Sequence, residues 1–347
     1  MLSGQTHPYF RKISWLFLLP AFLLGAMVVL SLKDQQMALP FMNVHGKVET
    51  TDNRSACGLT VARINGYRFV KPLLSVEQGC ESHLFTDLKS DLAGLTDSLK
   101  KAGAIQEASV YFRQFKQGEW FELNGDEKYH PASLMKVALL LAYLRTAESS
   151  PALFDQKILY TKPDSVKIPA DYFPAPTIQQ GKEYTIHDLL YFMAAHSDNN
   201  ATWLLASRLN GSLTNKVFSD LSLPVPTANN LEYKMSAREC SVLFRAIFNS
   251  TCLSPEYSEY AAELLSNCSF QEGFAKGFPK NTKMWHKFGE WIRPGTGLDC
   301  ELHESGIFYV DNTPYLLTVM TRGKDTNQLT SAIQAICRAT YKRVSAL

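Results

Sequence analysis

The chain has 347 residues, of which 46% are hydrophobic and 20% are charged, and its formal net charge is +2. This composition is typical of a globular protein with one large domain or two small ones. Because the charge balance is close to neutral, we exclude nucleic acids and acidic polymers as its main partners.

The first predicted element is a membrane anchor. Residues 13–32 form a 20-residue run without charge, preceded by Arg11 and Lys12, and a run of this length can span a bilayer. The basic residues favour a cytoplasmic N-terminus at residues 1–12, with the remainder periplasmic or extracellular. A cleaved signal peptide is the alternative, although its apolar core is usually shorter. Under both interpretations the rest of the chain is exported.

Residues 33–85 are predicted to form a linker or small appendage, with strand-like runs at 59–63 and 67–70. The seven cysteines show neither a C-x-x-C motif nor a nearby pair of histidines, so we expect no zinc site. In an exported chain, Cys57 and Cys80 can form a local disulfide. Cys240 and Cys337 lie in apolar helical patterns and are interpreted as small buried residues.

Residues 86–347 form the predicted main domain. The pattern predicts, in chain order, a helix at 86–101, a hairpin of strands at 108–115 and 119–123, a helix that begins at Ser133, loops at 157–183, helices at 185–195, 200–209, 236–248 and 255–265, strands at 284–288, 304–310 and 315–321, and a helix at 328–341. Because strands lie at both ends and helices between them, the order predicts an α+β fold. The N- and C-terminal strands would meet in one antiparallel sheet covered by helices, beside an all-helical subdomain.

The helix at Ser133 carries the first candidate for chemistry. Lys136 follows three residues later, and every residue from 137 to 144 is apolar or aromatic, which predicts a helix buried on all sides. Residues three apart share a helix face, and a desolvated lysine can act as a general base. Ser133 and Lys136 are therefore predicted to be an activated nucleophile and its base. A second Ser-x-x-Lys at Ser98 lies in a polar helix and is interpreted as a solvated face.

The second candidate is the polar cluster Ser197-Asp198-Asn199 between two apolar helices. These residue types are preferred helix caps, and a structural cap is one interpretation. The functional alternative is that the Ser197 hydroxyl relays a proton and the Asn199 side chain binds a substrate amide.

The third candidate is Lys287-Phe288-Gly289-Glu290 on a predicted strand. A glycine on the strand would let a ligand lie against its backbone. Lys-x-Gly alone is a weak signal, and it occurs twice more in this chain. The order and spacing of the three motifs decide the interpretation.

Ser-x-x-Lys, then Ser-Asp-Asn, then a strand Lys-x-Gly resembles the penicillin-recognising serine hydrolases, and most closely the class A β-lactamase-like group, over about residues 86–345. The resemblance implies that Ser133 is acylated, that Lys136 is the base and that Ser197 passes a proton to the leaving nitrogen. It implies further that Asn199 and Lys287 bind the substrate's amide and carboxylate. Backbone N–H groups of Ser133 and Glu290, next to Gly289, would form the oxyanion hole. It implies no cofactor or metal.

Two features depart from this family's pattern. Class A β-lactamases carry a Glu-x-x-Leu-Asn motif whose glutamate activates the water that hydrolyses the acyl-enzyme, and no such motif occurs here. Glu232 is the only acid in the corresponding loop, where it can substitute for that glutamate or simply be solvated. In addition, Phe288 replaces the usual Thr or Ser and removes a hydroxyl that would bind the substrate carboxylate.

The sequence therefore predicts an exported, membrane-anchored serine hydrolase that forms an acyl-enzyme at Ser133 with β-lactams or related peptide amides. One alternative is a penicillin-binding D,D-peptidase or transpeptidase-like enzyme that acts on peptidoglycan peptides and deacylates slowly. Another is a catalytically silent binding protein of the envelope that keeps the fold.

Overall fold

The computed structural model describes residues 49–51, 58–63, 73–163, 173–226, 233–292 and 299–347. The predicted anchor at 13–32 and the predicted strand at 67–70 lie outside these ranges. Within them, every helix is too short or too polar to cross a bilayer.

A small antiparallel sheet precedes the main domain. It consists of β1 (Glu49–Thr51), β2 (Leu59–Arg63) and β3 (Leu73–Gln78), in that order, and β2 coincides with the strand predicted at 59–63. Arg113 Nη2 of the main sheet donates a hydrogen bond to the Val76 carbonyl at 3.2 Å. Cys80 is disulfide-bonded, whereas its predicted partner Cys57 lies outside the described residues. The five cysteines at 240, 252, 268, 300 and 337 are free thiols.

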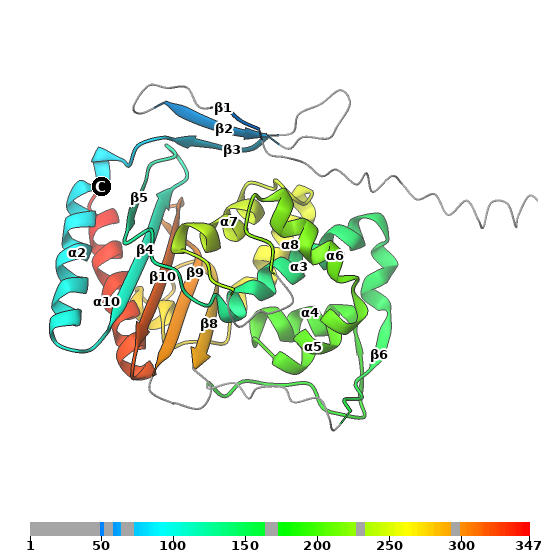
Figure 1. The fold of residues 1–347 in the computed structure, drawn as a ribbon. Helices are drawn as coiled ribbons and strands as arrows, with labels where there is room; N and C mark the ends of the chain where they lie inside the picture. The colour runs from blue at the N-terminus through cyan, green and yellow to red at the C-terminus, as the bar shows by residue number, and fades with distance from the viewer. Residues whose placement is uncertain (1–48, 52–57, 64–72, 164–172, 227–232, 293–298) are drawn as a thin grey trace, which may run out of the picture. The chain divides into compact units, whose positions relative to one another are not determined.

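The main sheet confirms the predicted α+β fold, because it joins strands from both ends of the domain. Its five antiparallel strands have the order β5-β4-β10-β9-β8 (Figure 1). Their bounds are β4 (Glu107–Gln114), β5 (Trp120–Leu123), β8 (Met284–Ile292), β9 (Cys300–Val310) and β10 (Thr313–Gly323). The strand β8, which carries Lys287, lies at one edge.

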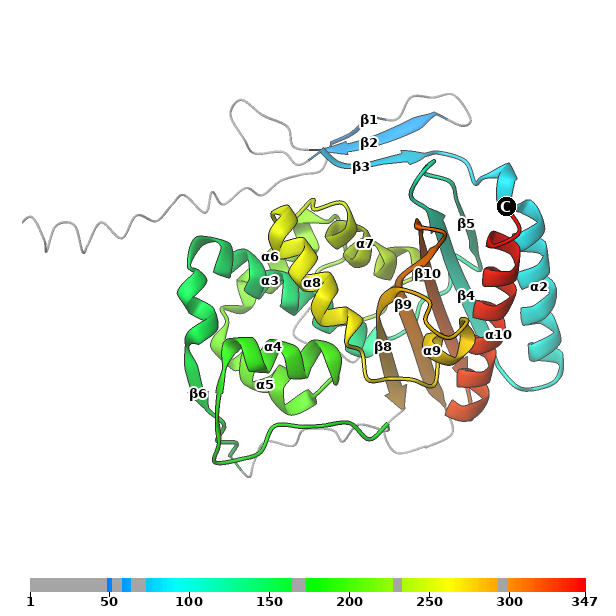
Figure 2. The same cartoon turned by 180° about the vertical axis from the view of Figure 1, so that it is seen from behind.

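Helices cover both faces of this sheet, so its strands are apolar on both sides. On one face, α2 (Thr86–Lys101) and α10 (Thr326–Val344) pack side by side, next to the short α9 (Phe274–Gly277) (Figure 2). The other face packs against the helical subdomain. Its helices are α3 (Lys136–Ser149), α4 (Ile186–Ala195), α5 (Asn199–Arg208), α6 (Gly211–Asp220), α7 (Ala237–Phe248) and α8 (Pro255–Ser266).

The sequence pattern missed α6 and a short strand pair. In α6 only three residues are buried, too few to produce a clear apolar period, and Asn210 caps its start. The strands β6 (Lys157–Leu159) and β7 (Glu183–Thr185) pair with each other at the two ends of the segment predicted as loops at 157–183. Each has three residues, and a run this short shows no periodicity.

Candidate active site

Ser133 lies in a tight turn that precedes the buried helix. Residues Ala132–Met135 form a 3₁₀ helix, and the Lys136 N–H donates to the Ser133 carbonyl. The α-helix therefore begins at Lys136 and not at Ser133 as predicted. In a 3₁₀ turn, side chains three residues apart are eclipsed, so Ser133 and Lys136 lie one above the other on the same face. Ala132 has φ of +49°, a strained conformation of the kind found at functional sites.

Lys136 is buried, with 7% of its surface exposed. Its Nζ donates hydrogen bonds to Ser197 Oγ at 3.0 Å, to Asn199 Oδ1 at 2.8 Å and to the Ser197 carbonyl. The apolar residues that follow it in α3 are all buried. The helix is therefore enclosed as predicted, and its one amine meets the polar cluster that lies 61 residues further along the chain.

The connection between α4 and α5 holds this polar cluster in place. Ser197 has φ of +58° and is 1% exposed. Asp198 caps α5 by accepting from the Asn200 N–H, and its other oxygen accepts from the Ile178 N–H at 2.8 Å. The cap interpretation is thus correct for Asp198, while the side chains on either side of it, Ser197 and Asn199, reach Lys136.

The strand β8 lies directly against the Ser133 turn. A Cβ added at Gly289 would lie 2.8 Å from the Pro131 carbonyl oxygen and 3.1 Å from the backbone nitrogens of Ser133 and Leu134. Real Cβ atoms do not approach backbone atoms this closely without a shift. Gly289 therefore makes room for the Ser133 turn, and its predicted role of letting a ligand lie against the strand backbone stays a prediction. The Ser133 N–H and the backbone between Gly289 and Glu290 therefore belong to two chain segments in contact with each other.

Lys287 is fully buried, and its Nζ lies 4.3 Å from the centre of the Phe288 ring. Burial lowers the pKa of the His196 imidazole, and the charge of Lys287 lowers it further. Lys287 is therefore electrostatically coupled to the residue that precedes Ser197. The Phe288 ring stacks on Phe270 at 4.4 Å in the core that faces α10.

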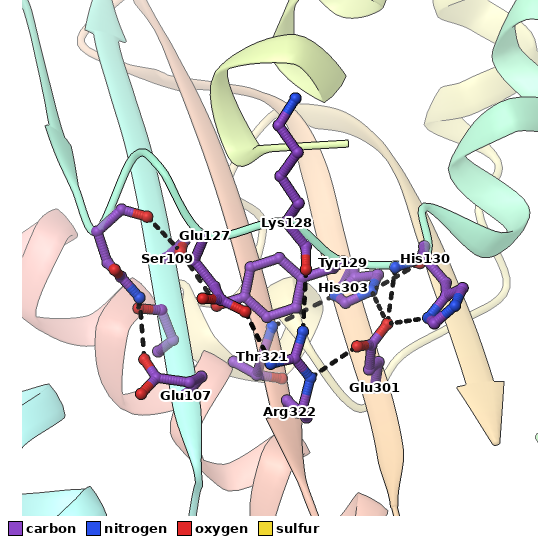
Figure 3. Close-up of polar contacts among 12 residues, drawn as sticks. Glu107, Ser109, Glu127, Lys128, Tyr129, His130, Glu301, His303, Thr321 and Arg322 are labelled. Atoms are coloured by element: carbon purple, nitrogen blue, oxygen red, sulfur yellow. Dashed lines mark hydrogen bonds and ion pairs between the residues drawn. The ribbon is translucent and has the colours of Figure 1, made fainter. Parts of the chain in front are cut away.

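A polar network supports the chain segment that leads into the Ser133 turn (Figure 3). Glu301 on β9 accepts from the His130 N–H at 2.8 Å and from Arg322 Nε at 2.8 Å. His303 Nδ1 accepts from the Thr321 N–H, so its Nε2 donates to the His130 carbonyl at 3.0 Å. Burial raises the pKa of Glu301, but the nearby His303, 3.7 Å away, and the hydrogen bonds from Arg322 and the His130 N–H outweigh it and lower the pKa from 4.5 to about 2.

The structure thus brings Ser133, Lys136, Ser197 and Asn199 together, with Gly289 against the Ser133 turn. Glu232, the candidate deacylating residue, lies outside the described residues. Among the residues that the structure does describe, no cluster of three or more His, Cys, Asp or Glu side chains is arranged to hold a metal ion.

The sheet order, the helical subdomain and the serine–lysine turn define a class of protein, the penicillin-recognising serine hydrolases. A family profile described as the beta-lactamase enzyme family matches residues 88–344. The chain belongs to this family. No curated protein matches it.

Solved structures share the fold at low identity. The structure of PBP-A is 20% identical, with a TM-score of 0.61, and the match covers 74% of this chain and 97% of that one. A class A beta-lactamase from Mycobacterium abscessus is also 20% identical, with a TM-score of 0.61 and coverage of 74% and 99%. A beta-lactamase from Chitinophaga pinensis is 16% identical, with a TM-score of 0.65 and coverage of 75% and 100%.

Sequence reasoning missed the residues that hold the site together from β9. Glu301, His303 and Glu304 are almost completely buried, although charged residues are rarely buried without partners. Their signal was present in the sequence, because a glutamate, a histidine and a second glutamate interrupt an otherwise apolar strand. Their partners are distant in sequence, so the pattern alone could not identify them.

Proposed function

We propose that this protein is an exported serine hydrolase that forms an acyl-enzyme at Ser133 with a β-lactam or a related peptide amide. The contact between Lys136 and the Ser197–Asn199 cluster supports the proposal most strongly. This contact places the buried Lys136 amine and the Ser197 hydroxyl, which can pass on a proton, in one hydrogen-bonded group. The group lies one 3₁₀ turn from Ser133. This arrangement matches the general requirements of an activated nucleophile.

The hydrogen bonds of Lys136 are consistent with a proton relay. Two of its partners, the Ser197 carbonyl and Asn199 Oδ1, can only accept. The third, the Ser197 hydroxyl, can accept from an ammonium or donate to a neutral amine. The cluster can therefore hold Lys136 both before and after it takes a proton.

Acylation would then proceed in two stages with three proton transfers. Neutral Lys136 takes the proton of Ser133 Oγ as that oxygen bonds to the substrate carbonyl carbon. When the C–N bond breaks, the Ser197 hydroxyl gives its proton to the leaving nitrogen and regains one from the Lys136 ammonium. Ser133 is left as an ester, and the amine site returns to its starting charge.

We assign the remaining roles by position around this centre. The N–H groups of Ser133 and Glu290 would stabilise the oxyanion, since Gly289 lies against the Ser133 turn. The Asn199 side chain would bind a substrate amide, and Lys287 would attract the substrate carboxylate.

Slow deacylation is a second candidate property, favoured by the missing Glu-x-x-Leu-Asn motif. The fold neighbour PBP-A is described as an acyl-enzyme complex with penicillin G in a leucine-to-glutamate variant, with 19% identity and a TM-score of 0.62. Without the glutamate of that motif, this chain would hold its acyl group longer than a β-lactamase does and would act as a peptidoglycan peptidase or transpeptidase.

We further propose that residues 13–32 anchor the protein in the membrane with the hydrolase domain outside the cytoplasm. The disulfide at Cys80 supports export, because disulfides persist in oxidising compartments. The anchor itself rests on the length and flanking charges of the apolar run.

A time course with a labelled penicillin tests these functions. Rapid release of labelled product supports a β-lactamase, whereas a label that stays bound supports a slowly deacylating peptidase. Lys136→Ala should abolish labelling, and Lys101→Ala, in the chain's other Ser-x-x-Lys, should leave it unchanged. A wild-type protein that takes up no label would instead support a catalytically silent binding protein.

A further inference from the structure

A group of buried ionisable side chains lies behind Lys287, on the opposite face of the edge strand. His286 Nδ1 of β8 is 2.6 Å from Glu304 Oε1 of β9, and their side chains are 4% and 0% exposed. Cys268, which is 5% exposed, lies close enough to His286 for its charge and hydrogen bonding to raise the pKa of the imidazole. Because Nδ1 of His286 faces Glu304, we infer that Nε2 of the same ring contacts Cys268. The three side chains thus form a series of sulfur, imidazole and carboxylate.

The backbone around the series is shaped to accept a charged Glu304. Its Oε2 accepts from the Phe274 N–H at 2.8 Å. A Cβ at Gly273 would lie 1.8 Å from the same oxygen, so only glycine leaves space for the carboxylate. The Phe274 ring stacks on His286 with centroids 5.8 Å apart. The imidazole is therefore held between a carboxylate and an aromatic face.

The Cys268 segment links this series to the serine cluster. Ser269, its neighbour, donates from N–H and from Oγ to the Ala195 carbonyl at 2.9 Å and 3.2 Å. Ala195 is the last residue of α4, two residues before Ser197. The contact between Cys268 and His286 therefore connects the strand of Lys287 and Gly289 to the helix end that positions Ser197.

We propose that Cys268, His286 and Glu304 form a buried thiolate–imidazolium–carboxylate triad that positions the Lys287 strand against the Ser197 helix end. The triad carries one net negative charge, and the adjacent, fully buried Lys287 ammonium carries the opposite one. A buried cluster with balanced charges avoids the large penalty of an uncompensated ion. These residues act as positioning residues, since none of them lies in the proposed set that contacts the substrate.

The pKa directions of two members of the triad favour this distribution of protons. Burial raises the pKa of the third member, Glu304, above its ordinary value, although the contacts with His286 and the Phe274 N–H lower it and favour the charged form. Burial raises the pKa of Cys268, but the charge and hydrogen bond of His286 and the charge of Lys287 outweigh it, so the pKa falls below its ordinary value. Burial lowers the pKa of His286, whereas Cys268 and Glu304 raise it to about 10. In α10, burial and the charge of Glu304 raise the pKa of Cys337 well above its ordinary value, so it stays a thiol.

The described part of the chain has four other free cysteines, and burial raises the pKa of each. Cys268 is thus expected to supply the thiolate absorbance of the native protein at neutral pH. The difference in ultraviolet absorbance between the wild type and Cys268→Ala measures it without any substrate. Cys252→Ala, whose thiol pKa is raised to about 11, is the matched control and should leave the absorbance unchanged.

The positioning role rests on the proposed function and is tested by acylation kinetics. Cys268→Ala should slow penicillin acylation by at least about tenfold, because small misplacements of reacting groups reduce rates strongly. Cys268→Asp keeps an anion and should retain more activity than Cys268→Ser, which keeps only the size and the hydrogen bond. A merely structural thiol would give the reverse order, because a buried aspartate would then be harmful.

The two measurements separate this inference from the proposed function. If the wild-type protein is not acylated, the proposed function fails, and the absorbance still decides whether the triad is ionised. If the absorbance shows a neutral thiol at position 268, or if Cys268→Ser retains more activity than Cys268→Asp, the triad is refuted whatever the acylation result.

Discussion

The contact between Gly289 and the Ser133 turn predicts that one added methyl group disables the site. Gly289→Ala places a Cβ 2.8 Å from the Pro131 carbonyl oxygen and 3.1 Å from the Ser133 nitrogen. Both are backbone atoms of a tight turn, so they cannot rotate away as a flexible side chain would. Either β8 or the Ser133 turn has to move.

The size of the effect follows from the cost of overpacking. Inserting a methyl group into a closely packed site typically costs about 1–3 kcal/mol. If the strain is relieved by displacing the Ser133 turn, acylation slows by roughly 5- to 150-fold, since each 1.36 kcal/mol is a factor of ten in rate. The same displacement would widen the proposed oxyanion hole between β8 and Ser133.

Acylation rates of Gly289→Ala and Gly94→Ala measure this effect. An added Cβ at Gly94, within α2, meets no atom within 4 Å, so this control should fold with equal or slightly greater stability and react like the wild type. Full acylation activity of Gly289→Ala would refute the close approach of β8 to the nucleophile turn.

Three further predictions concern stability. Because the pKa of Glu301 is lowered, ionised Glu301 stabilises the folded protein above pH 4.5, and this stabilisation is lost as the pH falls towards 2. In thermal unfolding over this pH range, the free energy of unfolding of Glu301→Gln should fall by about 3 kcal/mol less than that of the wild type. Asp198→Ala should lower the free energy of unfolding by about 2–4 kcal/mol, because a helix cap is lost and the buried Ile178 N–H is left without its acceptor. In urea titrations, Asp198→Asn keeps an acceptor oxygen and should lose less stability, and equal losses for the two variants would contradict this prediction. Cys80→Ser should destabilise the oxidised protein by about 2–4 kcal/mol, and a reducing agent should then lower the melting temperature of the wild type but not of this variant.

Much of the fold follows from local periodicity. The helix predicted at 86–101 coincides with α2 (Thr86–Lys101), and Thr185 caps α4 with a capping box to Asp188. Both elements have an apolar period, and α4 also has a clear start signal in its capping box. These are local properties. The burial of Lys136 was likewise predictable, because the residues after it are all apolar.

The missed parts depend on tertiary contacts. The strand β9 begins at Cys300, four residues before its predicted start, because Glu301 and His303 interrupt the apolar pattern. They are buried since Arg322 and the His130 backbone satisfy them, and these partners are far away in the sequence. The contact between Gly289 and the Ser133 turn was not predicted for the same reason, because no sequence pattern shows that this turn packs against β8.

Ser133 is proposed to be the nucleophile that accepts the acyl group. Mass spectrometry of the intact protein after exposure to a penicillin tests this role most directly. We expect a mass increase of one intact penicillin, located on the peptide that contains Ser133. The increase should be absent in Ser133→Ala and present in Ser98→Ala, which alters the chain's other Ser-x-x-Lys. An adduct that persists in Ser133→Ala would contradict the account.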